Sequence, residues 1–224
     1  MKRKLVLVTV IASMLVSGLT GCGSSAQTAT SSTTETATTA DAAVDTQTTG
    51  NDLNIMIETP VESLDPQIGQ DGTSFEVIAD FTDGLMQMDA EGSPVPAIAE
   101  SYEISEDGMT YTFHLRDDAK WSNGTEVTAA DFVFGWQRAV DPKNACEYSY
   151  MMSDIGQVKN AAEIIAGEKD KSELGVTALD DTTLQVELNV PVSYFLSLMY
   201  FPTFYPVNEE FYNTCADTFA SSPE

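Results

Sequence analysis

Residues 97–142 read AIAESYEISEDGMTYTFHLRDDAKWSNGTEVTAADFVFGWQRAVDP, and this stretch decides most of the predicted fold. Apolar side chains occupy every second position from Met109 to Leu115, which is the period of a strand that buries one face. Glu106-Asp107-Gly108 has the composition of a tight turn, and residues 102–105 before it are strand-like. The first half of the stretch therefore predicts a β-hairpin with one buried and one solvent-facing side.

The second half of the stretch predicts a turn followed by an amphipathic helix. Asn123-Gly124 marks the turn, and Thr128 is a suitable N-cap, with Asp131 placed to favour the positive end of the helix dipole. Asp141-Pro142 ends the helix, because the residue before a proline disfavours the helical conformation. The helix has an apolar stripe made of Phe132, Val133, Trp136 and Val140. We expect the large aromatic side chains to be core residues rather than ligand contacts, namely Phe113, Trp121, Phe132 and Trp136.

Further elements are predicted on both sides of this stretch. The expected elements are a strand at residues 53–57, a helix from Phe75 that ends before Gly84, a break in regular structure at residues 93–96, a helix at residues 158–166 capped by Gly167, and a hairpin that turns at Asp180-Asp181. Strands and helices do not alternate strictly along the chain. The predicted fold class is therefore α+β, that is, mixed α/β.

The composition excludes several classes of protein. The chain has 224 residues, 35 acidic against 10 basic side chains, a net charge of −25, one His and 3 Cys. An apolar content of 42% is enough to build a core, so wholesale disorder is excluded. The negative charge argues against a nucleic-acid partner, and three Cys are too few for a disulfide scaffold or a four-Cys zinc site.

The amino terminus has the layout of an export signal. Three basic residues at positions 2–4 precede an apolar run at residues 5–19, which is too short to cross a bilayer comfortably. Leu19-Thr20-Gly21-Cys22 resembles the bacterial lipobox, which implies that residues 1–21 are a signal peptide and that Cys22 carries a lipid anchor. The alternative is an ordinary cleaved signal with an incidental Cys.

The segment after Cys22 is expected to be a tether. Half of residues 23–50 are Ser or Thr and none is aromatic, so the segment cannot bury enough apolar surface to fold. We therefore expect residues 22–50 to be a disordered tether behind the lipid. Its length favours a Gram-positive surface over the periplasmic face of a Gram-negative cell, and a cleaved spacer or a glycosylation site is the competing interpretation.

The ordered set of motifs resembles family 5 of the bacterial extracellular solute-binding proteins. AIAESY (97–102), GMTYTFHLRD (108–117) and KWSNG (120–124) resemble the family signature. VTAADFVFGWQRAVDP (127–142), YFL (194–196) and FPTFYPVN (201–208) are similar to its oligopeptide-binding branch. The resemblance runs from about residue 51 to the last residue.

This resemblance implies a type II periplasmic-binding-protein-like fold and a role in an ABC importer. In the family, two lobes close on an extended peptide whose backbone pairs with protein strands. Residues 51–92 would begin the first lobe, residues 93–205 would form the additional α+β domain, and residues 206–224 would return towards the first lobe. Because family members are more than twice as long, we expect an incomplete fold without its second lobe, from an amino-terminal fragment or a truncated product.

The resemblance also implies where a ligand would bind. Contacts are expected from the loop after Asp65-Pro66, at Gln70, Asp71, Gly72 and Thr73, and from Tyr148; a solvent-facing loop is the competing interpretation for each. The implied partners are an oligopeptide, the permease subunits and, through Cys22, the extracytoplasmic face of the cell membrane. The protein is expected to be a monomer without a cofactor or metal. A lipid-anchored adhesion module, or a binding protein for dipeptides, pheromone peptides, nickel complexes or haem, remains an alternative.

Enzymatic functions are not predicted. A Ser–His–Asp site would require His114, which the alternation places on the exposed face of the hairpin, and no Gly-x-Ser-x-Gly motif is present. Cys146 and Cys215 could form a disulfide or remain two separate thiols.

Overall fold

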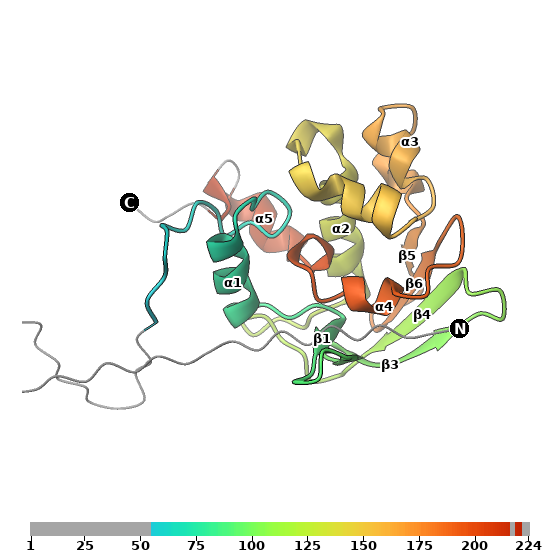
Figure 1. Ribbon diagram of the computed structural model, residues 1–224, viewed down its shortest axis with the longest axis horizontal. Helices are drawn as coiled ribbons and strands as arrows, with labels where there is room; N and C mark the ends of the chain where they lie inside the picture. Colours follow the sequence, from blue (N-terminus) through green and yellow to red (C-terminus); the bar gives the residue numbers. More distant parts are fainter. Residues whose placement is uncertain (1–54, 216–217, 221–224) are drawn as a thin grey trace, which may run out of the picture. The chain divides into compact units, whose positions relative to one another are not determined.

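A four-stranded antiparallel sheet is the main sheet of the computed structural model, which describes residues 55–215 and 218–220 (Figure 1). Its strands lie in the order β3 (Ala99–Ile104), β4 (Thr110–Leu115), β6 (Thr183–Glu187) and β5 (Val176–Ala178). The two predicted hairpins, β3–β4 and β5–β6, are both present, and β4 pairs with β6 to join them into one sheet. The predicted α+β class is confirmed.

The core lies on one face of this sheet. Tyr111, Phe113 and Leu115 of β4 are buried, and Leu184 and Val186 are buried beside them on β6. The register places Tyr111 opposite Val186 and Phe113 opposite Leu184, so the buried side chains form cross-strand pairs. The predicted alternation of β4 is therefore confirmed.

Helix α2 (Ala129–Val140) packs on β5 and β6. Phe132 and Trp136 are fully buried, and the indole Nε1 of Trp136 donates to the carbonyl oxygen of Phe204 over 2.8 Å. Thr128 is the N-cap residue as predicted, and the Asp131 carboxylate accepts a hydrogen bond from its backbone N–H over 2.8 Å. Phe113, Phe132 and Trp136 were predicted to be core residues, and the structure confirms this; Trp121 is the exception.

Trp121 is only partly buried. Its indole Nε1 donates to Asp131 Oδ2 over 3.2 Å, so its polar edge stays at the start of α2 while its rings pack against the core. Its contact with Asp131 links the turn at Asn123-Gly124 to the helix that follows it.

Shorter elements complete the described part of the chain. The α-helices are α1 (Gly72–Phe81), α3 (Ala161–Ile165), α4 (Phe195–Leu198) and α5 (Glu209–Cys215). The 3-10 helices are η1 (Pro142–Asn144), η2 (Glu147–Ser149), η4 (Lys171–Glu173) and η5 (Pro202–Phe204), and η3 (Met151–Ile155) is a π-helix. A separate two-stranded sheet pairs β1 (Met86–Met88) with β2 (Pro94–Pro96).

Two predicted elements differ from the structure. Residues 55–57 were expected in a strand, but they are exposed and have no strand partner among the described residues; a strand requires such a partner for its backbone groups. Residues 94–96 were expected to break regular structure, but they form β2. Prolines are tolerated there because β2 pairs on one side only.

Two predicted helices have different bounds. Helix α1 begins at Gly72, three residues before the expected start at Phe75, because Asp71 caps it. Helix α3 covers only residues 161–165 of the expected 158–166, since Asn160 before it is left-handed, with φ of 66°. The predicted signal peptide, Cys22 and the tether lie outside the described residues, within which no helix is long and apolar enough to span a membrane.

Candidate ligand-binding site

The loop that precedes α1 is anchored by a buried aspartate. Asp65 and Gln67 are 4% and 1% exposed, although both side chains are polar. The Asp65 carboxylate accepts the backbone N–H of Gln67 over 3.0 Å, and its carbonyl oxygen accepts those of Ile68 and Gly69 over 3.1 and 2.8 Å. These bonds fold the residues after Pro66 into a tight turn, which agrees with the loop predicted at Asp65-Pro66.

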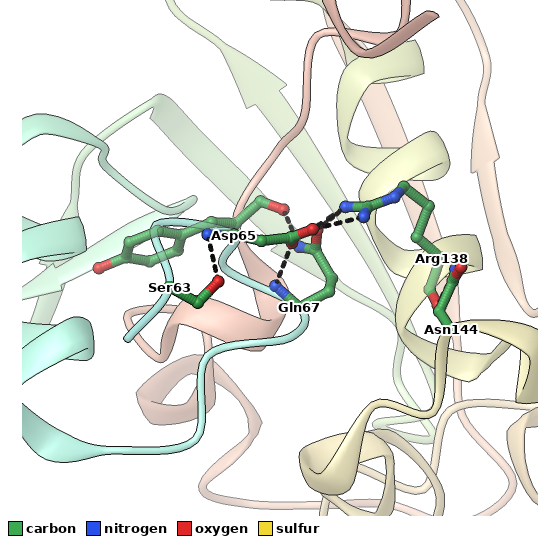
Figure 2. A network of polar contacts seen from close by, with 6 residues as sticks. Ser63, Asp65, Gln67, Arg138 and Asn144 are labelled. Carbon is green, nitrogen blue, oxygen red and sulfur yellow. Dashed lines mark hydrogen bonds and ion pairs between the residues drawn. The ribbon is translucent and has the colours of Figure 1, made fainter. Parts of the chain in front are cut away.

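Arg138 of α2 holds this turn in place (Figure 2). Its guanidinium donates to the two carboxylate oxygens of Asp65 over 2.6 and 3.2 Å, and to Gln67 Oε1 over 2.6 Å. The amide nitrogen of Gln67 in turn donates to the carbonyl oxygen of Tyr205 over 3.2 Å. Asp65, Gln67 and Arg138, which we call the loop anchor, therefore connect three segments that are far apart in the sequence.

The loop anchor is a charged pair that is almost completely removed from water. The side chains of Arg138 and Asp65 are 3% and 5% exposed. Burial alone would lower the pKa of Arg138, but the hydrogen bond and the charge of Asp65 outweigh it, so this pKa is raised above its usual value. The guanidinium also lies 4.4 Å from the ring centroid of Tyr212, within the range of a cation–π contact.

Asp71 ends the loop and begins α1. Its carboxylate accepts the backbone N–H of Ser74 over 2.8 Å, and the hydrogen bonds from Ser74 hold the pKa of Asp71 below its usual range. Ser74 is buried, and its hydroxyl oxygen accepts the backbone N–H groups of Glu62 and Ser63 over 3.0 and 3.2 Å. The far end of the loop is thus also held by side-chain hydrogen bonds.

The other residues expected at the site lie close by. Gln70 is exposed, and Gly72 and Thr73 form the first turn of α1, where the hydroxyl of Thr73 is 2.7 Å from that of Thr59. The hydroxyl of Tyr148 donates a long hydrogen bond of 3.4 Å to the carbonyl oxygen of Gln70. The two expected regions, 78 positions apart, therefore meet in the structure.

Aromatic rings surround Tyr148. The ring centroids of Phe75, Tyr148 and Phe201 lie 5.2, 5.2 and 5.3 Å from one another, and Tyr150 lies 5.9 Å from Tyr148. These four residues, which we call the aromatic cluster, come from α1, the η2 region and the segment before η5. None of them is fully buried, and Tyr150 is 43% exposed.

The sequence analysis did not identify the loop anchor or the aromatic cluster. Asp65 and Arg138 both lie in motifs that were quoted for other reasons, but nothing in one sequence pairs positions 73 residues apart. A basic side chain in the last turn of α2 is typical of a favourable contact with the helix dipole. The signal that could have identified Arg138 is its place next to Ala139 and Val140, which belong to the buried side of the helix.

The described residues contain no arrangement that suggests metal binding. No group of three His, Cys, Asp or Glu side chains in residues 55–215 and 218–220 is placed to hold a metal ion. Cys146 and Cys215 are two free thiols, which settles the alternative that was left open. Burial raises the pKa of Cys146 to about 11, so this thiol remains protonated and unreactive at neutral pH.

Comparison with known proteins identifies the family. Residues 93–223 match the family described as bacterial extracellular solute-binding proteins, family 5 Middle, and the chain belongs to this family. It is 46% identical over 145 residues to the probable deoxycholate-binding periplasmic protein YgiS of Escherichia coli K12, covering 65% of this chain and 27% of that protein. It is 42% identical over 158 residues to the oligopeptide-binding protein OppA of Bacillus subtilis 168, covering 70% of this chain and 28% of that protein.

Solved structures agree with this assignment. The substrate-binding domain of an oligopeptide ABC transporter from Bacillus anthracis superposes with a TM-score of 0.69 at 47% identity, covering 71% of this chain and 30% of that one. The structure of Listeria monocytogenes OppA bound to peptide superposes with a TM-score of 0.68 at 44% identity, covering 70% of this chain and 31% of that one. The fold is thus a part of the type II periplasmic-binding-protein fold, and the chain spans less than a third of the length of these relatives.

Proposed function

We propose that the chain belongs to the substrate-binding component of an ABC importer, which captures oligopeptides outside the membrane and delivers them to the permease. The observation that carries this proposal is the meeting of Gln70 and Tyr148 beside a loop that is anchored at both ends. A rigid loop suits a site that recognises a peptide backbone, because little ordering entropy is lost on binding. Relatives named for oligopeptide binding, such as OppA of Bacillus subtilis, support the ligand class.

Within this function, Gln70, Asp71, Gly72, Thr73 and Tyr148 are proposed to contact the peptide. The carboxylate of Asp71 already caps α1, so the loop is more suited to offer its backbone and the exposed side chain of Gln70. The assignment of residues 51–92 and 206–224 to the first lobe, and of residues 93–205 to the additional domain, belongs to the same proposal. No enzymatic activity is proposed, in keeping with the family of solute-binding proteins.

A chimera tests the proposed function. Residues 55–215 would replace the corresponding segment of Bacillus subtilis OppA, and binding of tri- to pentapeptides and of deoxycholate would be measured by calorimetry. We expect peptide binding, and we expect Tyr148→Ala to weaken it about tenfold, as for a buried aromatic contact. Tyr102→Ala is the matched control, since Tyr102 lies on β3 and is 37% exposed. A folded chimera that binds deoxycholate but no peptide would contradict the proposal.

We further propose that Cys22 anchors the protein on the extracytoplasmic face of the cell membrane. The support is the sequence pattern at residues 19–22, because Cys22 lies outside the described residues. With two or more acyl chains the anchor would be stable. Cys22→Ala is expected to move the protein from the detergent phase to the aqueous phase in a phase-partition experiment, whereas Cys215→Ala should remain in the detergent phase. Equal partition of the two variants would rule the anchor out.

A further inference from the structure

The aromatic cluster of Phe75, Tyr148, Tyr150 and Phe201 has features of a ligand subsite. Its rings come from three separate elements and meet edge-to-face or tilted, and each of the four residues keeps some exposure to solvent. Tyr148 and Phe201 border the buried core without being part of it. Because the Tyr148 hydroxyl reaches the carbonyl oxygen of Gln70, a peptide held at the loop would extend over these rings.

The segments that carry the cluster are acidic. Residues 70–76, 147–154 and 198–205 contain the carboxylates Asp71, Glu76, Glu147 and Asp154 and contain no Lys or Arg. Asp71 is held ionised by its hydrogen bonds from Ser74, and its Oδ2 has no hydrogen-bond partner among the described residues. No positive charge within these segments neutralises the four carboxylates.

Two of the basic side chains near these segments in sequence are engaged elsewhere. Arg138 is buried and is paired with Asp65, and Lys159 is paired with Glu187. Aromatic faces carry negative quadrupole density, so the rings and the carboxylates attract the same kind of group. A guanidinium suits both features because it is planar, weakly hydrated and always charged.

We propose that the aromatic cluster is a subsite for an arginine side chain of the bound peptide. The inference rests on the proposed peptide-binding function and names the ligand class that this site prefers. The flat guanidinium stacks on the exposed rings, and its charge is balanced by the carboxylates of the neighbouring segments. Citrulline has nearly the same shape without the charge, so it separates charge recognition from stacking alone.

A titration of the full chain by NMR tests this inference. The chain would carry labelled Tyr and Phe rings, and the probes would be the tripeptides Ala-Arg-Ala, Ala-Cit-Ala (Cit, citrulline) and Ala-Glu-Ala at up to millimolar concentrations. We expect the dissociation constant of the arginine peptide to be about fivefold lower than that of the citrulline peptide, with Ala-Glu-Ala weaker than both. The ring signals of Phe75, Tyr148 and Tyr150 should shift on binding.

Variants of the cluster separate a binding role from a role in folding. Tyr150→Leu should lower the ratio of the affinities for the arginine and citrulline peptides without affecting the fold, because Tyr150 is 43% exposed. Phe201→Leu should have the same effect with a similar side-chain volume. Tyr102→Leu on β3 should leave the ratio unchanged.

Equal affinities for the arginine and citrulline peptides would overturn the inference and leave peptide binding intact. NMR signals that shift only for residues outside the aromatic cluster would also overturn the inference and leave peptide binding intact. If no peptide shifted any signal while the protein remained folded, both this inference and the proposed function would fail for the chain.

Discussion

Replacing Arg138 by alanine is expected to lower the free energy of unfolding by about 3–5 kcal/mol, because it leaves the Asp65 carboxylate buried without its cation. It also removes three hydrogen bonds, one of which ties Gln67 to α2. For a domain of this size, such a loss lowers the melting temperature by roughly 10 °C. Urea unfolding followed by circular dichroism measures the free energy of unfolding, and a thermal scan measures the melting temperature.

Arg116→Ala is the matched control for this variant. Arg116 and Asp118 also form an ion pair, but their side chains are 50% and 73% exposed. Ion pairs exposed in this way contribute little to stability, so this control should unfold close to the wild type. Replacing both Asp65 and Arg138 by leucine should recover much of the loss, since no charge then remains buried alone. Equal stabilities of Arg138→Ala and Arg116→Ala would show that the loop anchor contributes nothing to the fold.

Gly84→Ala is expected to be the second strongly destabilising substitution, with a loss of about 3 kcal/mol. A Cβ atom at position 84 would overlap the carbonyl oxygen of Met199 and would lie 2.9 Å from the ring of Tyr205. The carbonyl oxygen belongs to the backbone and cannot move aside by a change of rotamer. The substitution therefore separates the start of β1 from the segment between α4 and η5, which a lower urea midpoint would report.

Gly72→Ala serves as the comparison for Gly84→Ala. Gly72 is the first residue of α1, its φ is not positive, and a Cβ atom there would meet nothing within 4 Å. Alanine favours the helix by roughly 0.5–1 kcal/mol, so the stability should be unchanged or slightly higher. If Gly72→Ala destabilised the protein as much as Gly84→Ala, the steric explanation would be wrong.

The sequence predicted best those elements whose signals are local. The alternation of residues 109–115 and the turn at Gly108, with φ of 70°, are properties of a short segment, and the structure confirms them. The N-cap at Thr128 is equally local. Residues 55–57 have the pattern of a strand, but pattern alone supplies no partner, and no described strand pairs with them. The two prolines of β2 predicted a break where the structure has a strand. A proline destabilises a strand only when the edge that needs its N–H is paired, and the sequence does not show which edge is paired.

The candidate site was predictable only in part, for a related reason. The family resemblance indicated Gln70 and Tyr148, yet their contact joins positions 78 residues apart. The buried Arg138 was not recognised as a structural residue, since a charged side chain is usually solvated. Phe75 was assigned only to a predicted helix and Phe201 only to a family motif, and an aromatic residue in an apolar segment is typical of a core.

The anchoring of the loop at both ends has a consequence for protein engineering. Asp65 and Gln67 hold the beginning of the loop to α2, and Ser74 holds its end through the backbone of Glu62 and Ser63. The residues between these two attachment points, 68–73, do not share in either set of side-chain bonds, apart from the capping carboxylate of Asp71. They form a cassette in a fixed frame: sequences of the same length that keep a glycine at position 69, where a Cβ atom would lie 3.1 Å from the ring of Phe75, and an aspartate at position 71 can be exchanged there without redesigning the scaffold.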